Sequence, residues 1–305
     1  MGHFLCLADH SVAEITSFLD MADRIKANPA AYATRCRGKT LAMIFQKPSL
    51  RTRVSFQTGI YQLGGQGLYL GPKDIQLHRG ESIADTAKVL SRYVDGIMAR
   101  VFSHSDVQDL AEHGSIPVIN GLSDLLHPCQ VLADLQTIRE SKGDLAGLKL
   151  AYVGDGNNMA HSLLYGGVKM GMTVSISHPS GYAPDTGVVA RAKEIAEETG
   201  GGIQITENPQ EGVADADVVY TDVWASMGQE EERQERLARF EGYCVDADLM
   251  GCADQEAIFL HCLPAHRGEE VAGSVIDGPQ SRVFDEAENR LHAQKSLMVS
   301  LMGDA

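Results

Sequence analysis

The stretch TLAMIFQKPSLRTR, residues 40–53, places an uninterrupted apolar run directly before a cluster of charged and hydroxyl side chains. The apolar run, 40–45, predicts a strand buried on both faces, because helices cover both faces of a parallel sheet. The residues that follow predict a helix over 52–63, which ends at the glycine pair 64–65. A buried strand followed by a helix is the repeating unit of an α/β fold.

The same alternation runs through the whole chain in two halves of similar length. A first helix begins near Ser11, where Ser11 and Glu14 match a capping box. Further strands are expected at 67–70, 96–101, 117–120, 149–154, 173–177, 202–206, 217–223 and 257–263. Further helices are expected at 82–94, 104–112, 127–142, 158–170, 185–199, 229–240 and 285–301.

This pattern predicts an α/β fold of two doubly wound parallel-sheet domains joined by the long helix over 127–142. The expected domains are residues 1–126 together with the C-terminal helix 285–305, a bridging helix at 127–143, and residues 144–284. Ligands of open parallel sheets bind beyond the carboxyl ends of the strands. We therefore expect the active site in the cleft between the two domains.

Charge and composition exclude several classes of protein. The chain has 305 residues, with 26 lysines and arginines against 41 aspartates and glutamates, and a formal net charge of −15. This acidic balance argues against a nucleic-acid partner, whose recognition needs a basic face. No apolar run reaches the roughly 18 residues of a membrane helix, so no membrane partner is expected. The six cysteines form no C-x-x-C pair and the N-terminus has no signal-peptide pattern, so we expect a cytoplasmic enzyme with reduced thiols.

The densest cluster of candidate functional residues is the segment 47–53. Ser49 is placed to cap the following helix, whose first N–H groups would then face an anion. Arg51 and Arg53 add guanidinium groups that pair with phosphate or carboxylate oxygens, and Thr52 adds a hydroxyl. Two arginines in the first turn of a helix oppose its dipole, and an anionic ligand would remove that conflict. The alternative interpretation is a solvated basic turn.

Three further sites of interest lie outside that segment. His127 and Gln130 stand three residues apart at the start of the long helix, so both side chains can point the same way, towards a carbonyl oxygen and an N–H group. The alternative is a histidine that only caps the helix. Arg100, at the end of an expected buried strand, needs an anionic partner. Arg290, on the last helix, either reaches into the cleft or pairs with a surface carboxylate.

The second half carries polar residues at the turns after its strands. The turn 154–158 lacks the third glycine of the dinucleotide fingerprint, which argues against a nicotinamide site. One of Asn157 and Asn158 is expected to cap the next helix, which leaves the other for a ligand. Asp222 follows a strand, where a carboxylate suits an ammonium group, although turn-forming aspartates are equally common there.

The segment 261–266, His-Cys-Leu-Pro-Ala-His, invites two further interpretations. A zinc site of His261, Cys262 and His266 lacks the paired ligand spacing of structural zinc, which argues against it. Cys262 is the best candidate for a reactive thiol. However, neighbours in an extended strand point to opposite faces, so His261 is badly placed to activate it.

Taken together, these motifs resemble the aspartate/ornithine carbamoyltransferase family over residues 3–302, and its ornithine-using members most closely. The resemblance implies transfer of a carbamoyl group from carbamoyl phosphate to the δ-amine of L-ornithine, giving L-citrulline and phosphate, as in arginine metabolism. It implies no metal and no cofactor, and a homotrimer or a multiple of trimers. The motifs stand in the family's order: Ser49-Leu50-Arg51-Thr52-Arg53, His127-Pro128-Cys129-Gln130, Asp222 with Ser226-Met227-Gly228, and His261-Cys262-Leu263-Pro264.

The resemblance also assigns roles to individual residues. The catalytic residues it implies are Arg100, His127, Cys262 and Arg290. Those it implies for binding carbamoyl phosphate are Ser49, Leu50, Arg51, Thr52, Arg53, Arg100, His127, Gln130, Cys262, Leu263 and Arg290. Those it implies for binding ornithine are Asn158, Asp222, Ser226 and Met227.

Some positions depart from the family pattern, and they bear on the substrate. Leu50 replaces the first threonine of the usual Ser-Thr-Arg-Thr-Arg motif, and His78 stands where relatives more often carry glycine. The loop around His78 lacks the lysine of aspartate carbamoyltransferases, which counts against aspartate. His-Cys-Leu-Pro at 261–264, rather than Lys-Cys-Leu-Pro, counts against acetylornithine. Putrescine as acceptor stays open, and so does a non-catalytic anion-binding relative.

Overall fold

The computed structural model describes residues 2–75, 80–225 and 232–303, and the chain divides into two compact units. Unit 1 comprises Met1–Gln136 and Glu288–Ala305, and unit 2 comprises Thr137–Ala287. The boundaries fall within helix α5 (Pro128–Lys142) and within helix α12 (Val283–Met302). Each of these two helices therefore contributes residues to both units. The assignment of functions to the domains expected from the sequence, 1–126 with 285–305 and 144–284, stays a prediction.

Unit 1 is built on a parallel sheet of four strands in the order β2-β1-β3-β4. Residue Ala42 of the central strand pairs with Leu68 on one side and Ile97 on the other. The strands are β1 (Thr40–Phe45), β2 (Gln66–Leu70), β3 (Gly96–Arg100) and β4 (Val118–Leu122). The helices, besides parts of α5 and α12, are α1 (Val12–Ala27), α2 (Leu50–Gln62), α3 (Ile83–Tyr93) and α4 (His104–His113), with single 3₁₀ turns at Leu7–Asp9 and Pro29–Tyr32.

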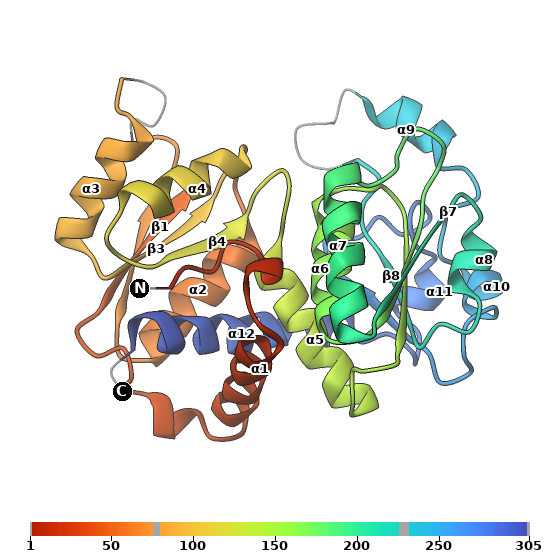
Figure 1. The fold of residues 1–305 in the computed structure, drawn as a ribbon, viewed down its shortest axis with the longest axis horizontal. Coiled ribbons are helices and arrows are strands. Elements are labelled where there is room, and N and C mark those ends of the chain that lie inside the picture. Colours follow the sequence, from red (N-terminus) through yellow and green to blue (C-terminus); the bar gives the residue numbers. More distant parts are fainter. Residues whose placement is uncertain (1, 76–79, 226–231, 304–305) are drawn as a thin grey trace. The chain divides into compact units, whose positions relative to one another are not determined.

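Helices cover both faces of this sheet, with α3 and α4 on one face and α2 and α12 on the other (Figure 1). The first face packs Ala42 and Ile44 against Ala87 of α3 and Val107 of α4. On the second face α2 and α12 approach closely: a Cβ at Gly59 would lie 2.9 Å from a methionine methyl of α12. This doubly covered arrangement explains why every residue of β3, and every residue of β1 after Thr40, is buried.

Unit 2 contains a second parallel sheet, with five strands in the order β7-β6-β5-β8-β9. The strands are β5 (Lys149–Val153), β6 (Thr173–Ser177), β7 (Gly202–Thr206), β8 (Val218–Thr221) and β9 (Ile258–His261). The helices are α6 (Asn158–Lys169), α7 (Thr186–Thr199), α8 (Pro209–Val213), α9 (Arg233–Arg239), α10 (Ala247–Met250) and α11 (Gly273–Ile276). In Figure 1, α6 and α7 lie side by side, and α8, α10 and α11 lie on the other side of the sheet.

The prediction of an α/β fold with two parallel sheets is confirmed. Every expected strand is present, and three of them, 40–45, 173–177 and 202–206, have the expected bounds. The short helices α8, α10 and α11 were not predicted. The helix expected over 229–240 appears as α9, with residues 229–231 lying outside the described part of the chain. Within the described residues, no helix combines the length and the apolar character needed to span a membrane.

Candidate active site

The first part of the candidate site is the start of α2, directly after strand β1. Ser49 is the N-cap of α2, and its Oγ accepts a hydrogen bond from the Thr52 N–H group at 3.2 Å, as predicted. Arg53 lies in the first turn, with its guanidinium carbon 3.9 Å from the centroid of the Tyr69 ring on β2. The side chain of Leu50 is 75% exposed. A hydroxyl at that position is therefore not needed for the internal structure of α2.

Arg290 of α12 forms a buried cluster with two other predicted phosphate-site residues. Its guanidinium donates to Gln130 Oε1 at 2.6 Å and to Thr52 Oγ1 at 3.4 Å. The same side chain donates to Gln294 Oε1 at 2.9 Å. Arg290, Gln130 and Thr52 are each at most 2% exposed. Of the two interpretations of Arg290 left open by the sequence, the surface ion pair is therefore wrong.

His127 lies directly before α5, and the charges of three arginines act on it. Burial lowers the pKa of His127 well below its ordinary value of 6.5, and the nearby positive charges of Arg290, Arg100 and Arg51 lower it further. The imidazole of His127 is therefore uncharged at neutral pH. The arginines supply the positive charge of this region.

Arg100 ends strand β3 and is buried, as the position at the end of an apolar strand predicted. Its carbonyl oxygen accepts a hydrogen bond from the Gln46 N–H group at 2.8 Å. The pairing of β3 with β4 shifts register between Ala99 and Arg100. Irregularities of this kind re-aim side chains at the ends of strands, next to binding sites. Lys47 follows the neighbouring strand, and its Nζ lies 4.4 Å from the Phe102 ring centroid.

Three residues of this cluster were missed by the sequence analysis: Asp134, Gln294 and Ser55. Asp134 accepts a hydrogen bond from Gln130 Nε2 at 2.8 Å, and Gln294 donates to Ser55 Oγ at 2.7 Å. Asp134 stands four residues after Gln130, and Gln294 four residues after Arg290. A spacing of four places two side chains on one face of a helix. This spacing from a predicted site residue is the sequence feature that could have indicated Asp134 and Gln294.

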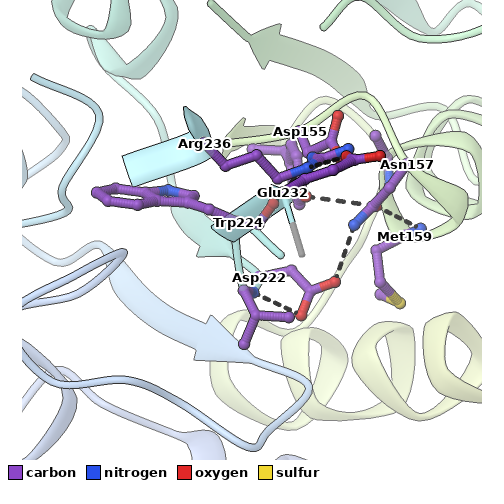
Figure 2. Close-up of polar contacts among 10 residues, drawn as sticks. Asp155, Asn157, Met159, Asp222, Trp224, Glu232 and Arg236 are labelled. Carbon is purple, nitrogen blue, oxygen red and sulfur yellow. Dashed lines mark hydrogen bonds and ion pairs between the residues drawn. The ribbon is translucent and has the colours of Figure 1, made fainter. Parts of the chain in front are cut away.

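Unit 2 contains its own group of predicted residues, at the carboxyl ends of β5, β8 and β9. Asp222, which follows β8, accepts a hydrogen bond from Asn157 Nδ2 at 3.1 Å and one from Cys262 Sγ at 3.1 Å. Figure 2 shows the contact between Asn157 and Asp222. Asn157 also caps α6, because its Oδ1 accepts from the N–H groups of residues 159 and 160. Asn158 is the first residue of α6.

Two residues assigned to the ornithine site, Ser226 and Met227, lie outside the described residues, and so does His78. Asn157, one of the two candidates for the cap, is the cap and is also in contact with Asp222. Its position directly before an expected helix was the signal for the cap. The contact with Asp222 joins turns 65 residues apart, and no sequence pattern predicts it.

Both ring nitrogens of His261 have partners within unit 2. Its Nδ1 accepts a hydrogen bond from the Leu263 N–H group at 2.8 Å, and its Nε2 lies 3.2 Å from Oε1 of the buried Glu270. The ligand atoms of Asp222, His261 and Cys262 lie within 4.8 Å of one another. Because both ring nitrogens already have partners, this group is a hydrogen-bonded cluster and does not favour zinc. The Cys262 thiol donates a hydrogen bond to Asp222 Oδ1.

Leu263 adopts a left-handed backbone conformation, with φ of 58°. Non-glycine residues rarely adopt this region, and such residues concentrate at functional sites. The hydrogen bond from its N–H group to His261 holds this turn directly after Cys262. The structure therefore fixes the backbone of the His-Cys-Leu-Pro motif through the imidazole of its first residue.

Comparison with known proteins identifies the family. Residues 2–140 match the family described as "Aspartate/ornithine carbamoyltransferase, carbamoyl-P binding domain", and residues 146–301 match "Aspartate/ornithine carbamoyltransferase, Asp/Orn binding domain". The chain belongs to the aspartate/ornithine carbamoyltransferase family. The second match includes Arg290, although Arg290 belongs to unit 1 and donates hydrogen bonds to Thr52 and Gln130 of that unit.

Individual carbamoyltransferases cover almost the whole chain. The ornithine carbamoyltransferase of Thermococcus kodakarensis is 59% identical over 301 residues, which are 98% of this chain and 96% of that protein. The solved structure of ornithine carbamoyltransferase from Pyrococcus furiosus is 54% identical, with a TM-score of 0.95 over 98% of this chain and 96% of that one. That of the anabolic ornithine carbamoyltransferase from Campylobacter jejuni is 40% identical, with a TM-score of 0.94 over 99% of both chains.

Proposed function

We propose that this chain is an ornithine carbamoyltransferase, which transfers the carbamoyl group of carbamoyl phosphate to the δ-amine of L-ornithine. The products are L-citrulline and phosphate. The observation that carries this proposal is the buried cluster of Arg290, Gln130 and Thr52 beside a neutral His127, within a family that uses carbamoyl phosphate. Relatives named as anabolic enzymes support a role in arginine biosynthesis.

The arginines of unit 1 suit the anionic donor. In the proposed mechanism the phosphate binds at the start of α2, between the N–H groups of the first turn and the guanidinium groups of Arg51, Arg53 and Arg100. These groups stabilise the charge that develops on the departing phosphate. The capping bond of Ser49 supports this assignment, because it fixes the first turn of α2 before any ligand binds.

The carbonyl group of carbamoyl phosphate becomes an oxyanion as the amine attacks. We assign its stabilisation to Arg100, Thr52 and the neutral His127, which donates a hydrogen bond without carrying a charge of its own. Gln130 is assigned to the amide of the carbamoyl group. Its contact with Arg290 supports this role, because the contact holds Gln130 in one orientation.

The acceptor binds to unit 2 in this proposal. Asp222 carries the carboxylate for the α-ammonium group of ornithine. Asn158, the first residue of α6, completes the set assigned from the family together with Ser226 and Met227. Cys262 and Leu263 lie at the reaction centre. The hydrogen bond from the Cys262 thiol to Asp222 supports this grouping, because it places the two residues within one cluster. No metal or cofactor has a role in this mechanism.

We further propose a homotrimer, or a multiple of trimers, that works in the cytoplasm. Helix α2 exposes apolar side chains on one face, including Val54 and Tyr61, and a face of this kind suits contact with a second copy of the chain. The six cysteines are thiols, as expected in a reducing compartment.

The deciding experiment is an assay of carbamoyl transfer from carbamoyl phosphate to four amines at equal concentration: ornithine, putrescine, acetylornithine and aspartate. We expect a clear preference for ornithine. The variants Arg51→Ala and His127→Ala are expected to keep the fold, as judged by circular dichroism, and to lose turnover. A preference for putrescine would show that putrescine, rather than ornithine, is the acceptor. Turnover of none of the four amines would contradict an enzymatic role.

A further inference from the structure

Arg236, a residue of α9 with no assigned role, is buried at the end of the unit 2 sheet and only 7% exposed. One terminal nitrogen, Nη1, donates to Asp155 Oδ2 at 2.7 Å and to the Trp224 carbonyl oxygen at 2.9 Å. The Nε nitrogen donates to Glu232 at 3.0 Å. Figure 2 shows this side chain between the segment after β5 and the segment after β8. The guanidinium therefore joins two turns that are distant in sequence.

These two turns carry the polar residues of the candidate acceptor site. Asp155 stands two residues before Asn157, whose N–H group donates to the Asp155 carbonyl at 2.7 Å. Trp224 stands two residues after Asp222. The turns meet a second time through the bond from Asn157 Nδ2 to Asp222. Arg236 and this bond thus close a ring of contacts that sets the distance between the two turns.

Charge gives a second reason for the position of Arg236. Burial raises the pKa of Asp155, the Arg236 guanidinium opposes that rise, and the neighbouring Asp222 carboxylate adds to it. Two carboxylates therefore stand near each other at this end of the sheet, and Arg236 pairs with one of them. An unpaired buried carboxylate is costly, so without the guanidinium the turn at Asp155 would rearrange.

One aromatic ring lies near the cation and packs in a cluster with two others. The guanidinium carbon of Arg236 lies 5.0 Å from the Tyr182 ring centroid, and the Trp224 and Phe240 rings stack with centroids 5.4 Å apart. A hydrogen bond to a charged group is stronger where water is excluded. Trp224 is the only tryptophan of the chain, so its fluorescence reports on this place alone.

We propose that Arg236 is a positioning residue for the amino-acid acceptor, acting by holding the turns of Asn157 and Asp222 at a fixed distance. The inference rests on the proposed function, because it names the acceptor site of that reaction. It predicts that loss of Arg236 raises the KM for ornithine while the KM for carbamoyl phosphate, whose assigned residues are mostly in unit 1, stays within about twofold.

The test compares Arg236→Gln and Arg236→Lys with the control Arg233→Gln. Arg233 lies three residues earlier on the same helix, is far more exposed, and pairs with Glu269. We expect Arg236→Gln to raise the KM for ornithine about tenfold, since a shift of the order of an ångström in a positioning contact costs up to about 100-fold. Arg236→Lys keeps the charge but not the planar fork, and we expect an intermediate rise. The control should behave as the wild type.

Trp224 emission gives a readout that does not depend on activity. We expect a red shift of the emission in the unliganded Arg236→Gln variant and none in Arg233→Gln, with unchanged far-ultraviolet circular dichroism in both. Equal rises in the KM values of both substrates, or a KM for ornithine that stays at the wild-type value in both Arg236 variants, would overturn the inference. If the wild type turns over no ornithine, the proposed function fails, and unchanged Trp224 emission would then overturn the inference separately.

Discussion

At the scale of single residues, the neutral state of His127 makes stability depend on pH. Burial, followed by Arg290, Arg100 and Arg51, lowers its pKa well below 6.5, whereas in the unfolded chain it titrates near 6.5. Below that value the unfolded chain binds a proton that the folded chain does not. The free energy of unfolding therefore falls as the pH drops from 6.5 towards the folded pKa, by at most about 1.4 kcal/mol per pH unit for this group.

The variant His127→Gln removes this contribution. We expect urea unfolding between about pH 7.5 and pH 5 to show a smaller loss of stability in His127→Gln than in the wild type. His113, an exposed residue in the last turn of α4, provides the control variant His113→Gln. An identical pH slope in His127→Gln and the wild type would show that His127 titrates normally in the folded protein.

Arg290 makes a second prediction at this scale. A lysine ammonium at position 290 cannot reach Gln130, Gln294 and Thr52 together, as the guanidinium does. We expect Arg290→Lys to lower kcat/KM for carbamoyl phosphate at least about tenfold in steady-state assays. Glu288→Gln, an exposed change on the same helix, should leave kcat/KM near the wild-type value. Equal kcat/KM in Arg290→Lys and the wild type would remove Arg290 from the site.

The candidate site could be predicted only in part, and the reason lies in sequence distance. The motif at 47–53 and the pair His127 and Gln130 were visible because each lies within one local segment. The contact between Arg290 and Gln130 joins residues 160 positions apart, and composition and periodicity carry no information about it. The family resemblance supplied the grouping that local patterns lack.

At the scale of elements, the N-cap of α2 separates a structural from a functional effect. Ser49 caps α2 and Ser82 caps α3, each through a hydrogen bond from the helix N3 N–H group, at 3.2 and 3.0 Å. We expect Ser49→Ala and Ser82→Ala each to lower the free energy of unfolding by about 1 kcal/mol, measured by urea unfolding. Only Ser49→Ala should also raise the KM for carbamoyl phosphate. A similar KM in both variants would place the phosphate elsewhere.

Elements were predictable where their pattern was long enough to repeat. Strands such as Thr40–Phe45 and Thr173–Ser177 are runs of strand-forming residues between turn residues, and their predicted bounds are confirmed. Helices α10 and α11 contain four residues each, little more than one turn, so no helical period is completed within them. They form because side chains such as Met250 and Ile276 pack into the unit 2 core, which is a tertiary effect.

At the scale of the whole molecule, the exposed face of α2 argues for assembly. Leu50, Val54 and Tyr61 are 75%, 51% and 77% exposed, and their spacing places them along one side of the helix. Water-exposed apolar side chains gathered on one helix favour burial against another surface. In a ring of three copies this face meets a different surface of the next copy, since a closed cyclic trimer is built from heterologous contacts.

We therefore expect the wild type to sediment at about three times its chain mass of 32.9 kDa, or at a multiple of that, at micromolar concentration. The double variant Val54→Glu with Tyr61→Glu places two charges on this face, and burying them without partners costs several kcal/mol each, so it should sediment as the single chain. Phe284→Glu changes a residue of unit 2 that is 69% exposed and should keep the wild-type mass. A wild type that sediments as a single chain would contradict the trimer. A double variant that stays trimeric would move the contact to another surface of the chain, because two buried, unpaired carboxylates could not remain at an interface formed by α2.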